Sequence, residues 1–238
     1  MARAYLTENY RYVNSFLSIR SPMRASTDQP TAAAEADLRT RIVEAATRQF
    51  LLNGIATVTM DELAAELGIS KRTLYQVFPS KDALLDEVLD RRAARASEML
   101  EGIVEAPHLG SGDKLRLLME RMGAFLAEVK PPFIHSLKRL APDRYLWLEQ
   151  RRREFHQRFY GALLEQARRE GALRPEVDLA YAMELIWSVM QASFDPGLLE
   201  RLSLSPSESL HRGMTILFRG LLADGGEPLR PPVPSTEV

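Results

Sequence analysis

Two short amphipathic stretches separated by a glycine stand out along the chain, within residues 59–78. In both stretches the apolar residues recur at helical spacing. Thr59 and Glu62 form a capping-box pattern before the first stretch, and Gly68 permits a left-handed turn between the two. This pattern predicts a helix-turn-helix, a motif whose second helix lies in the major groove of DNA.

The same periodicity predicts the helices that flank this motif. A helix from about Asp37 to Leu52 precedes it and ends at Asn53-Gly54, a strong stop signal. Ser80 caps a longer helix, from Lys81 to about Val104. We therefore expect a DNA-binding domain over residues 36–96, with the long helix as the link to the rest of the chain.

The remaining pattern is helical throughout and predicts an all-α fold with a second domain over residues 105–223. The helix after Asp178 is apolar nearly all round, which argues for burial on more than one side, whereas the last helix carries a single apolar stripe. The expected segments are a helix ended by Pro131-Pro132, a short piece over residues 133–140, a long helix capped by Asp143 and closed by Gly171, a helix over residues 178–194, and a last helix over residues 210–221.

The two ends of the chain are predicted to be flexible. Residues 1–34 form an extension in which apolar positions at helical spacing precede prolines and small residues. Three interpretations stay open: a short helix with a linker, a native start at Met23, and an arm that carries Arg20 and Arg24 into a minor groove. Four prolines predict a disordered tail over residues 224–238.

Composition narrows the function classes. The net charge is −1, so DNA binding must come from a local basic surface. We interpret Arg91, Arg92 and Arg95 as a solvated face of the long helix rather than a DNA patch. The absence of cysteine excludes disulfides and thiolate chemistry and fits a reducing cytosol. No apolar run approaches the roughly 18 residues of a membrane helix, so we expect a cytoplasmic protein that does not contact membranes.

Motifs of enzymes and metal sites find no support in the sequence. It contains no glycine-rich phosphate loop, no H-E-x-x-H and no G-x-S-x-G. Two Glu-x-x-His pairs, Glu105 with His108 and Glu208 with His211, have the spacing used in di-iron bundles. Pro107 lies inside the first pair, where a helix must already be ending. We expect no catalytic residue, no metal site and no cofactor.

A longer signature surrounds the helix-turn-helix, from Arg41 to Leu89. It consists of IVEAATRQFLLNG, the TMDELA cap, GISKRTLY and FPSKDALL, in about fifty consecutive residues. This signature resembles the DNA-binding domain of the tetracycline-repressor (TetR) family of bacterial regulators. The resemblance implies a transcription regulator, expected to be a repressor, that binds a palindromic operator in double-stranded DNA as a homodimer and is released by a small molecule.

The resemblance assigns DNA contacts to five residues of the second helix and to one residue at the start of each neighbouring helix. In chain order these are Thr59, Lys71, Arg72, Thr73, Tyr75, Gln76 and Lys81. Two bases and no acid lie between Leu67 and Ser80, which independently predicts a locally positive face. A packing role for Tyr75 and a solvated position for Arg72 remain open alternatives.

Large, adaptable and partly aromatic side chains in the middle helices favour a pocket for a lipophilic or aromatic small molecule, although ordinary cores are lined in the same way. The candidate lining residues are Met122, Phe125, Phe133, Trp147, Phe155, Phe159, Met183 and Trp187. Possible polar partners, none of which the sequence singles out, are His135, Arg152, His156 and Glu184. The alternative is a second domain that binds a protein partner instead of a small molecule.

By resemblance, the last two helices pair with their copies in a four-helix bundle and form a two-fold dimer. The alternative is that both helices complete the core of a monomer. A dimer has a functional advantage, because two recognition helices on a two-fold axis read a palindrome with half-sites roughly 34–36 Å apart.

Overall fold

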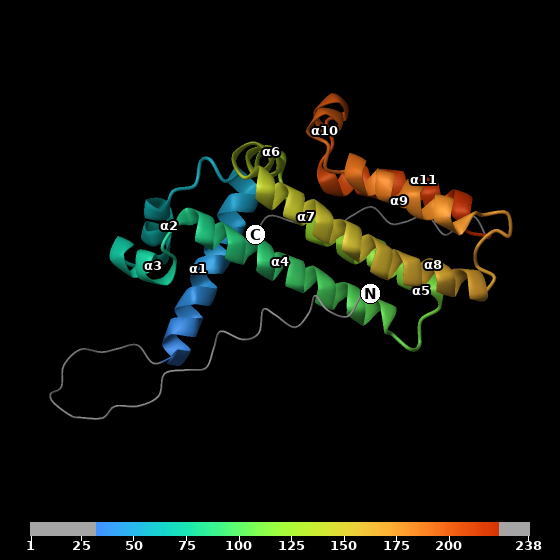
Figure 1. The fold of residues 1–238 in the computed structure, drawn as a ribbon, viewed down its shortest axis with the longest axis horizontal. Helices are drawn as coiled ribbons and strands as arrows, with labels where there is room; N and C mark the ends of the chain where they lie inside the picture. The colour runs from blue at the N-terminus through green and yellow to red at the C-terminus, as the bar shows by residue number, and fades with distance from the viewer. Residues whose placement is uncertain (1–31, 224–238) are drawn as a thin grey trace, which may run out of the picture. The chain divides into compact units, whose positions relative to one another are not determined.

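The computed structural model describes residues 32–223, which form α-helices and one π-helical segment (Figure 1). Within this range no β-strand occurs, and the backbone pairing outside helices is one antiparallel bridge between Leu173 and Leu222. The predicted all-α fold is confirmed. Residues 36–238 belong to one compact unit and residues 1–35 to another, of which only the first turn of a helix is described. The predictions for residues 1–31 and 224–238 lie outside the described residues.

The first three helices are α1 (Ala32–Asn53), α2 (Met60–Leu67) and α3 (Lys71–Val77). Helix α1 begins five residues before the predicted Asp37, because four alanines and Glu35 are good helix formers and extend the helix beyond its first core residue. Phe50, Leu63 and Leu74 bury their side chains between these helices and are at most 1% exposed. Their burial fixes how α3 is presented to solvent.

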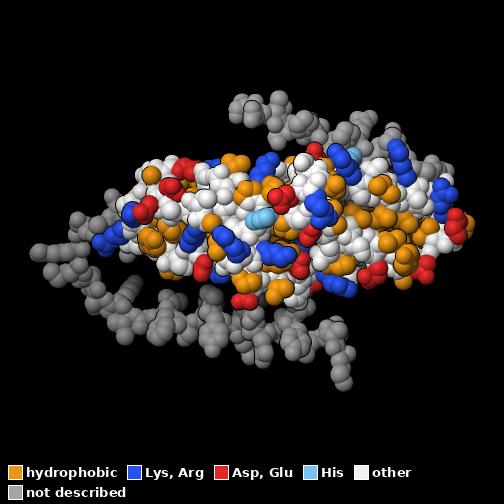
Figure 2. Space-filling model, turned by 90° about the horizontal axis from the view of Figure 1, so that it is seen from above, with side chains coloured by type: hydrophobic (Ala, Val, Ile, Leu, Met, Phe, Trp, Pro, Cys, Tyr) orange, Lys and Arg blue, Asp and Glu red, His pale blue; other side chains and the backbone are white. Residues whose placement is uncertain are grey.

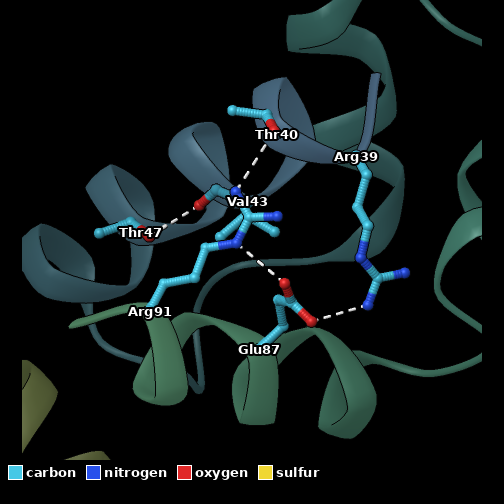
Figure 3. A network of polar contacts seen from close by, with 6 residues as sticks. All are labelled: Arg39, Thr40, Val43, Thr47, Glu87 and Arg91. Atoms are coloured by element: carbon cyan, nitrogen blue, oxygen red, sulfur yellow. Dashed lines mark hydrogen bonds and ion pairs between the residues drawn. The ribbon is translucent and has the colours of Figure 1, made fainter. Parts of the chain in front are cut away.

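Helix α4 (Lys81–Val104) is held to α1 by a polar network centred on Glu87 (Figure 3). Arg39 Nη2 of α1 donates to Glu87 Oε2 at 2.7 Å, and Arg91 Nε of α4 donates to Glu87 Oε1 at 2.8 Å. Arg91 Nη1 also reaches Thr40 Oγ1 at 3.4 Å. One carboxylate therefore joins two helices that are far apart in the sequence.

Farther along α4, Arg92 joins this helix to α5 (Ser111–Ala127) and corrects a prediction. Its Nη1 donates to Glu128 Oε2 at 2.6 Å, its Nη2 donates to the Phe125 carbonyl at 3.1 Å, and its guanidinium lies 4.1 Å from the Phe125 ring centroid. The side chain is only 11% exposed. Arg92 is thus not part of a solvated face, because a partly exposed carboxylate and an aromatic ring offset the cost of burying its charge.

Helix α6 (Pro131–Leu140) contacts the end of α1 and the loop after it. Both prolines occupy the first turn of α6, where a missing N–H costs nothing, so they begin this helix as well as following α5. Lys130 N donates to the Leu51 carbonyl at 3.0 Å, and Ile55 N donates to Ser136 Oγ at 2.8 Å inside the core.

Gly54 makes this contact between α6 and the loop possible. Its φ is +82°, and a Cβ at this position would lie 2.7 Å from the Pro132 carbonyl oxygen. Both the backbone conformation and the space therefore require glycine.

The predicted long helix is divided into α7 (Pro142–Phe155), a π-helical segment η1 (His156–Tyr160) and α8 (Gly161–Arg169). The prediction that Asp143 caps this helix is wrong. Ala141 is the N-cap residue and makes no side-chain hydrogen bond, while Pro142 takes the first helical position and places Asp143 inside the first turn. Asp143 there still favours the positive end of the helix dipole.

The chain ends in α9 (Leu179–Ala192), α10 (Pro196–Leu202) and α11 (Pro206–Leu221). Helix α10 was not predicted, and its Asp195 cap and following proline were the available signals. A Cβ on Gly213 would lie 2.5 Å from Val189 Cγ1, so this glycine allows α11 to approach α9 closely. None of the helices between residues 32 and 223 is both long enough and apolar enough to span a membrane.

The outer side of α9 and α11 remains apolar and exposed. Helix α9 buries Ala182, Ile186 and Met190, so in the described chain it is covered along one face only. Tyr181 is 66% exposed and Ile216 of α11 is 73% exposed. Figure 2 looks onto the side on which α9 and α11 lie and shows hydrophobic side chains gathered over part of it.

Candidate nucleic-acid interface and ligand cavity

Side-chain caps at both helix starts hold the turn between α2 and α3. Thr59 Oγ1 accepts from Glu62 N at 3.2 Å, and the Glu62 carboxylate accepts from Thr59 N at 2.9 Å. Ser70 Oγ accepts from Thr73 N at 3.0 Å. Gly68 ends α2 at φ +67°. Thr59, Glu62 and Ser70 satisfy backbone N–H groups at the helix starts, and Gly68 permits the left-handed end of α2, as the sequence predicts.

Helix α3 presents four of the predicted DNA-contacting side chains to solvent: Lys71, Arg72, Tyr75 and Gln76. Tyr75 is 47% exposed, while Leu74 beside it is fully buried. Thr73 is half-buried, and its hydroxyl shares a 2.8 Å hydrogen bond with Ser70 Oγ. Its methyl group is therefore the part suited to a base contact, since a thymine methyl accepts apolar neighbours.

The charge of this face differs from the prediction because Asp61 of α2 forms an ion pair with Lys71 Nζ. Counting charges only between Leu67 and Ser80 missed this acid, which the turn brings back toward α3. Arg72 has no ion-pair partner among the described residues. The exposed face is thus less positive than predicted and depends more on Arg72.

The two predicted phosphate anchors lie at the starts of α2 and α4. The Thr59 hydroxyl is already used by Glu62, so the amides of the first turn of α2 are the groups left to bind a phosphate oxygen. The Thr59 backbone N–H and then its hydroxyl lower the pKa of Glu62. Burial lowers the pKa of Lys81, against opposing effects of Asp82 and Glu62.

A largely apolar cavity of about 110 Å³ lies among the middle helices. Its wall includes Leu89, Arg92, Ala96 and Leu100 of α4, Met122, Phe125 and Leu126 of α5, Phe133, Ile134 and Leu137 of α6, Tyr145, Leu148, Arg151, Arg152 and Phe155 of α7, His156 and Tyr160 of η1, and Met190, Phe194 and Leu210 farther along the chain. The side chains thus come from seven elements spread over more than a hundred residues.

Four of the eight predicted lining residues are in this wall: Met122, Phe125, Phe133 and Phe155. Trp147, Phe159, Met183 and Trp187 are not. Phe159 is 2% exposed and packs in the core 5.9 Å from the Phe155 ring. Of the possible polar partners, Arg152 and His156 are in the wall, whereas His135 and Glu184 are not. The sequence reasoning missed Arg92 and Arg151, because a basic residue on a helix is usually solvated.

Over residues 32–223 no three potential metal-ligating side chains come together. Helix α4 ends at Val104, so His108 is beyond the helix and cannot share a helical face with Glu105. The cavity wall likewise holds no carboxylate.

Comparison with known proteins places the helix-turn-helix in a family. The family described as "Bacterial regulatory proteins, tetR family" matches residues 42–88. The HTH-type transcriptional regulator YvaF of Bacillus subtilis, itself uncharacterized, is 27% identical over 166 residues, which are 70% of this chain and 86% of YvaF. EthR of Mycobacterium tuberculosis is 42% identical over 53 residues, which are 22% of this chain and 24% of EthR.

Solved structures share the fold of about four fifths of this chain. SmeT, the repressor of the Stenotrophomonas maltophilia multidrug efflux pump SmeDEF, aligns with a TM-score of 0.60 at 18% identity and covers 82% of this chain and 97% of its own. The ketosteroid regulator KstR2 of Mycobacterium tuberculosis has a TM-score of 0.52 at 21% identity, over 78% of this chain and 95% of its own. The relatives and neighbours named here are transcriptional regulators and not enzymes, as the sequence predicts for this chain.

Proposed function

This chain is a helix-turn-helix transcriptional regulator of the TetR family, and we propose that it acts as a homodimeric repressor that a small ligand releases from its operator. The description of SmeT as the repressor of an efflux pump supports the repressing role. The proposal has three parts: DNA reading by α3, dimerisation through α9 and α11, and ligand binding in the cavity.

The exposed side chains of α3 are suited to reading base edges. Arg72 would pair with a guanine, Gln76 with an adenine, and the Thr73 methyl group with a thymine methyl. Tyr75 and Lys81 would contact phosphates, with the amides at the start of α2. Lys71 would also contact a phosphate, once DNA displaces Asp61 from the Lys71 ammonium group.

The exposed apolar side of α9 and α11 supports the dimer. Leu185 is half-buried and is not among the side chains packed against the core, so it adds to the apolar surface near Tyr181 and Ile216. We expect Ile216→Arg to shift the protein from dimer to monomer in size-exclusion chromatography with light scattering. Leu202→Arg, at a 56% exposed position on α10, serves as the control and should leave the dimer intact.

The observation that carries the ligand response is that α4 both lines the cavity and holds α1. Leu89, Arg92 and Ala96 contribute to the wall, and Glu87, on the preceding turn, makes the network with Arg39. Helix α6 offers a second route, since Phe133 lines the cavity and Ser136 binds the loop after α1. A ligand that favours a shifted α4 therefore changes the placement of α3.

The coupling that this requires is modest. A differential affinity of about 1–3 kcal/mol between the two conformers changes DNA affinity roughly 5–150-fold. The test is a gel-shift series on the DNA upstream of the protein's own gene and on a sequence-selected pool. Salt-sensitive, sequence-specific binding of a dimer is expected, and no enriched sequence in either experiment would refute the proposal.

A further inference from the structure

The cavity carries polar groups that its apolar walls do not explain. Arg152, His156 and Tyr160 follow one another at intervals of four residues along the end of α7 and the π-helical segment, and all three line the cavity. The Tyr160 hydroxyl donates to Met119 Sδ at 3.8 Å, a weak contact. Arg152 and His156 have nitrogen atoms without a hydrogen-bond partner over residues 32–223.

Arg152 is a buried cation that is only partly paired. Its Nη2 donates to Glu149 Oε1 and to Gln191 Oε1, both at 3.1 Å, and its guanidinium lies 4.0 Å from the Phe194 ring centroid. Nε and Nη1 are buried and have no hydrogen-bond partner among the described residues. Leaving such donors unsatisfied destabilises the fold, and more so when the group is charged.

His156 adds a second unpaired atom on the next helical turn. The side chain is 3% exposed, and its Nε2 has no partner within the described part of the chain. Burial lowers the pKa of His156, against opposing effects of the Met183 backbone and Glu184, and this shift favours the neutral ring. A neutral imidazole can donate from one nitrogen and accept at the other.

The charges around the cavity favour an anion. Arg92, Arg151 and Arg152 line it, and no carboxylate does. Each arginine forms an ion pair with an acid outside the wall: Glu128 for Arg92, Glu154 for Arg151 and Glu149 for Arg152. Asp90 also lies close enough to Arg151 for its pKa to be affected by that charge. These acids reduce the positive potential, but Nε and Nη1 of Arg152, a residue of the wall, still lack a hydrogen-bond partner among the described residues.

The volume limits the apolar part of the ligand. A dry engineered cavity of about 150 Å³ holds one benzene molecule. The cavity here, at about 110 Å³, thus accepts no more than one ring or a short chain unless its Met and Phe side chains move.

We infer that the effector is a small amphipathic carboxylic acid, bound with its carboxylate on Arg152 Nε and Nη1, its second polar contact at His156, and its ring or short chain against Phe125 and Phe133. This inference rests on the proposed function, because it names the chemical class of the ligand that the cavity takes. Binding satisfies the orphaned donors with charge-assisted hydrogen bonds, which are the strong ones.

The test compares acids with neutral molecules of the same shape on the full-length protein. Phenylacetate is matched with phenylacetamide, and hexanoate with hexanamide, in isothermal titration and thermal-shift measurements at pH 7. We expect each acid to bind about 10–100-fold more tightly than its amide, as charge-assisted hydrogen bonds of about 1.5–3 kcal/mol imply. Equal binding of acid and amide, or no binding of any acid of up to eight carbons at millimolar concentration, would overturn the inference.

Two variants locate the anion. Arg152→Met should remove the preference for the acid while leaving amide binding within about threefold. Arg151→Met is the matched control. Arg151 also lines the cavity and is also ion-paired, but its side chain is 48% exposed. If both variants lose the preference equally, general attraction by a basic helix explains it and the site assignment is wrong. Should Arg152→Met not fold, Arg152→Lys keeps the charge and is expected to retain only part of the preference.

A gel shift with the same compounds separates the inference from the proposed function. Acids that bind through Arg152 without releasing DNA would contradict ligand release and leave the anion site standing. Amides that bind the protein and release DNA as well as the acids do would contradict the anion site and leave ligand release standing.

Discussion

The α2–α3 unit and the wall of the cavity use their polar groups in opposite ways. In the α2–α3 unit each helix start is capped by a residue at most three positions away, as with Thr59 and Glu62 or Ser70 and Thr73. In the cavity wall Arg152 pairs with Glu149, three residues away, and with Gln191, 39 residues away, and still has two nitrogens without a partner in the described part of the chain. One region is completed by its own local sequence, and the other is completed only by packing or by a ligand.

This difference fits the roles proposed for the two regions. A recognition helix must reach DNA with a fixed geometry, and local caps supply that without depending on the state of the rest of the chain. A responsive cavity needs two arrangements of nearly equal free energy, and partly satisfied groups bias one of them when a ligand arrives. The contacts between the regions, at Gly54 and Glu87, are therefore where the comparison can be tested.

The largest effect is expected from Gly54→Ala, compared with Gly68→Ala. Both glycines have positive φ, but only at Gly54 would a Cβ meet a distant segment, while at Gly68 nothing lies within 4 Å. We expect a loss of about 2–4 kcal/mol in the free energy of unfolding for Gly54→Ala and about 1–2 kcal/mol for Gly68→Ala. Urea unfolding of the two variants measures this, and equal losses would show that the contact with α6 adds no constraint.

The next effect concerns DNA affinity and separates sequence reading from phosphate anchoring. Gln76→Ala should cost about 1–3 kcal/mol on the preferred operator and relax the preference at one base pair. Lys81→Ala should weaken binding to all sequences alike and reduce the slope of log affinity against log salt by about one. Binding titrations at several salt concentrations distinguish the two, and a changed sequence preference for Lys81→Ala would contradict its assigned role.

A smaller effect, with a pH dependence, is expected for Glu87→Gln. The hydrogen bond from Arg39, and then that from Arg91, hold the pKa of Glu87 below its ordinary value of 4.5. A depressed pKa contributes stability that is present above the ordinary value and is lost as the pH falls through the pKa of the folded state. We therefore expect the variant to be less stable than the wild type by up to about 1 kcal/mol at pH 7, and the difference to shrink below pH 4.5.

Thermal unfolding of the variant and the wild type, compared at each pH, measures this difference. The other carboxylates titrate alike in both proteins, so their contributions cancel. Glu101→Gln, on the same helix and paired with the exposed Arg158, is the control. A difference that grew as the pH fell would contradict the assignment of Glu87.

The smallest effect is expected for Asp61→Asn. Its ion pair with Lys71 is exposed, so the free energy of unfolding should change by no more than about 0.5 kcal/mol. Freeing Lys71 should raise DNA affinity about 2–5-fold at low salt. Asp113→Asn makes the same change in net charge within α5 and should leave affinity unchanged. A lower affinity for Asp61→Asn would mean that this acid positions Lys71 for its phosphate.

The local signals in the sequence were enough to predict the α2–α3 unit, because its caps and turn depend on residues within a few positions of one another. Thr59, Gly68 and Ser70 lie where their residue types predict. The boundaries were less accurate where two signals competed, as at Pro142, which took the helix start expected for Asp143.

The cavity could be predicted only in part, because its wall depends on which faces of seven elements meet. Hydrophobic side chains such as Phe133 are candidates in any core, and the sequence does not distinguish lining from packing. The buried state of Arg92 and Arg152 depends on Glu128, Gln191 and two aromatic rings, none of which is close in the sequence. The role of Asp61 depends similarly on the turn that returns α3 beside α2.

The π-helical segment between α7 and α8 has a consequence for how this regulator can diverge. A π turn is equivalent to one extra residue in an α-helix, and each residue turns the helix by about 100°. Because the π turn absorbs that extra residue within one turn, deleting one residue between His156 and Tyr160 would restore an α turn and leave Arg152 facing nearly the same way relative to Leu163. A residue gained here would instead turn Arg152 by about 100°, so we expect an insertion to change the proposed ligand site while α2 and α3 keep their sequence.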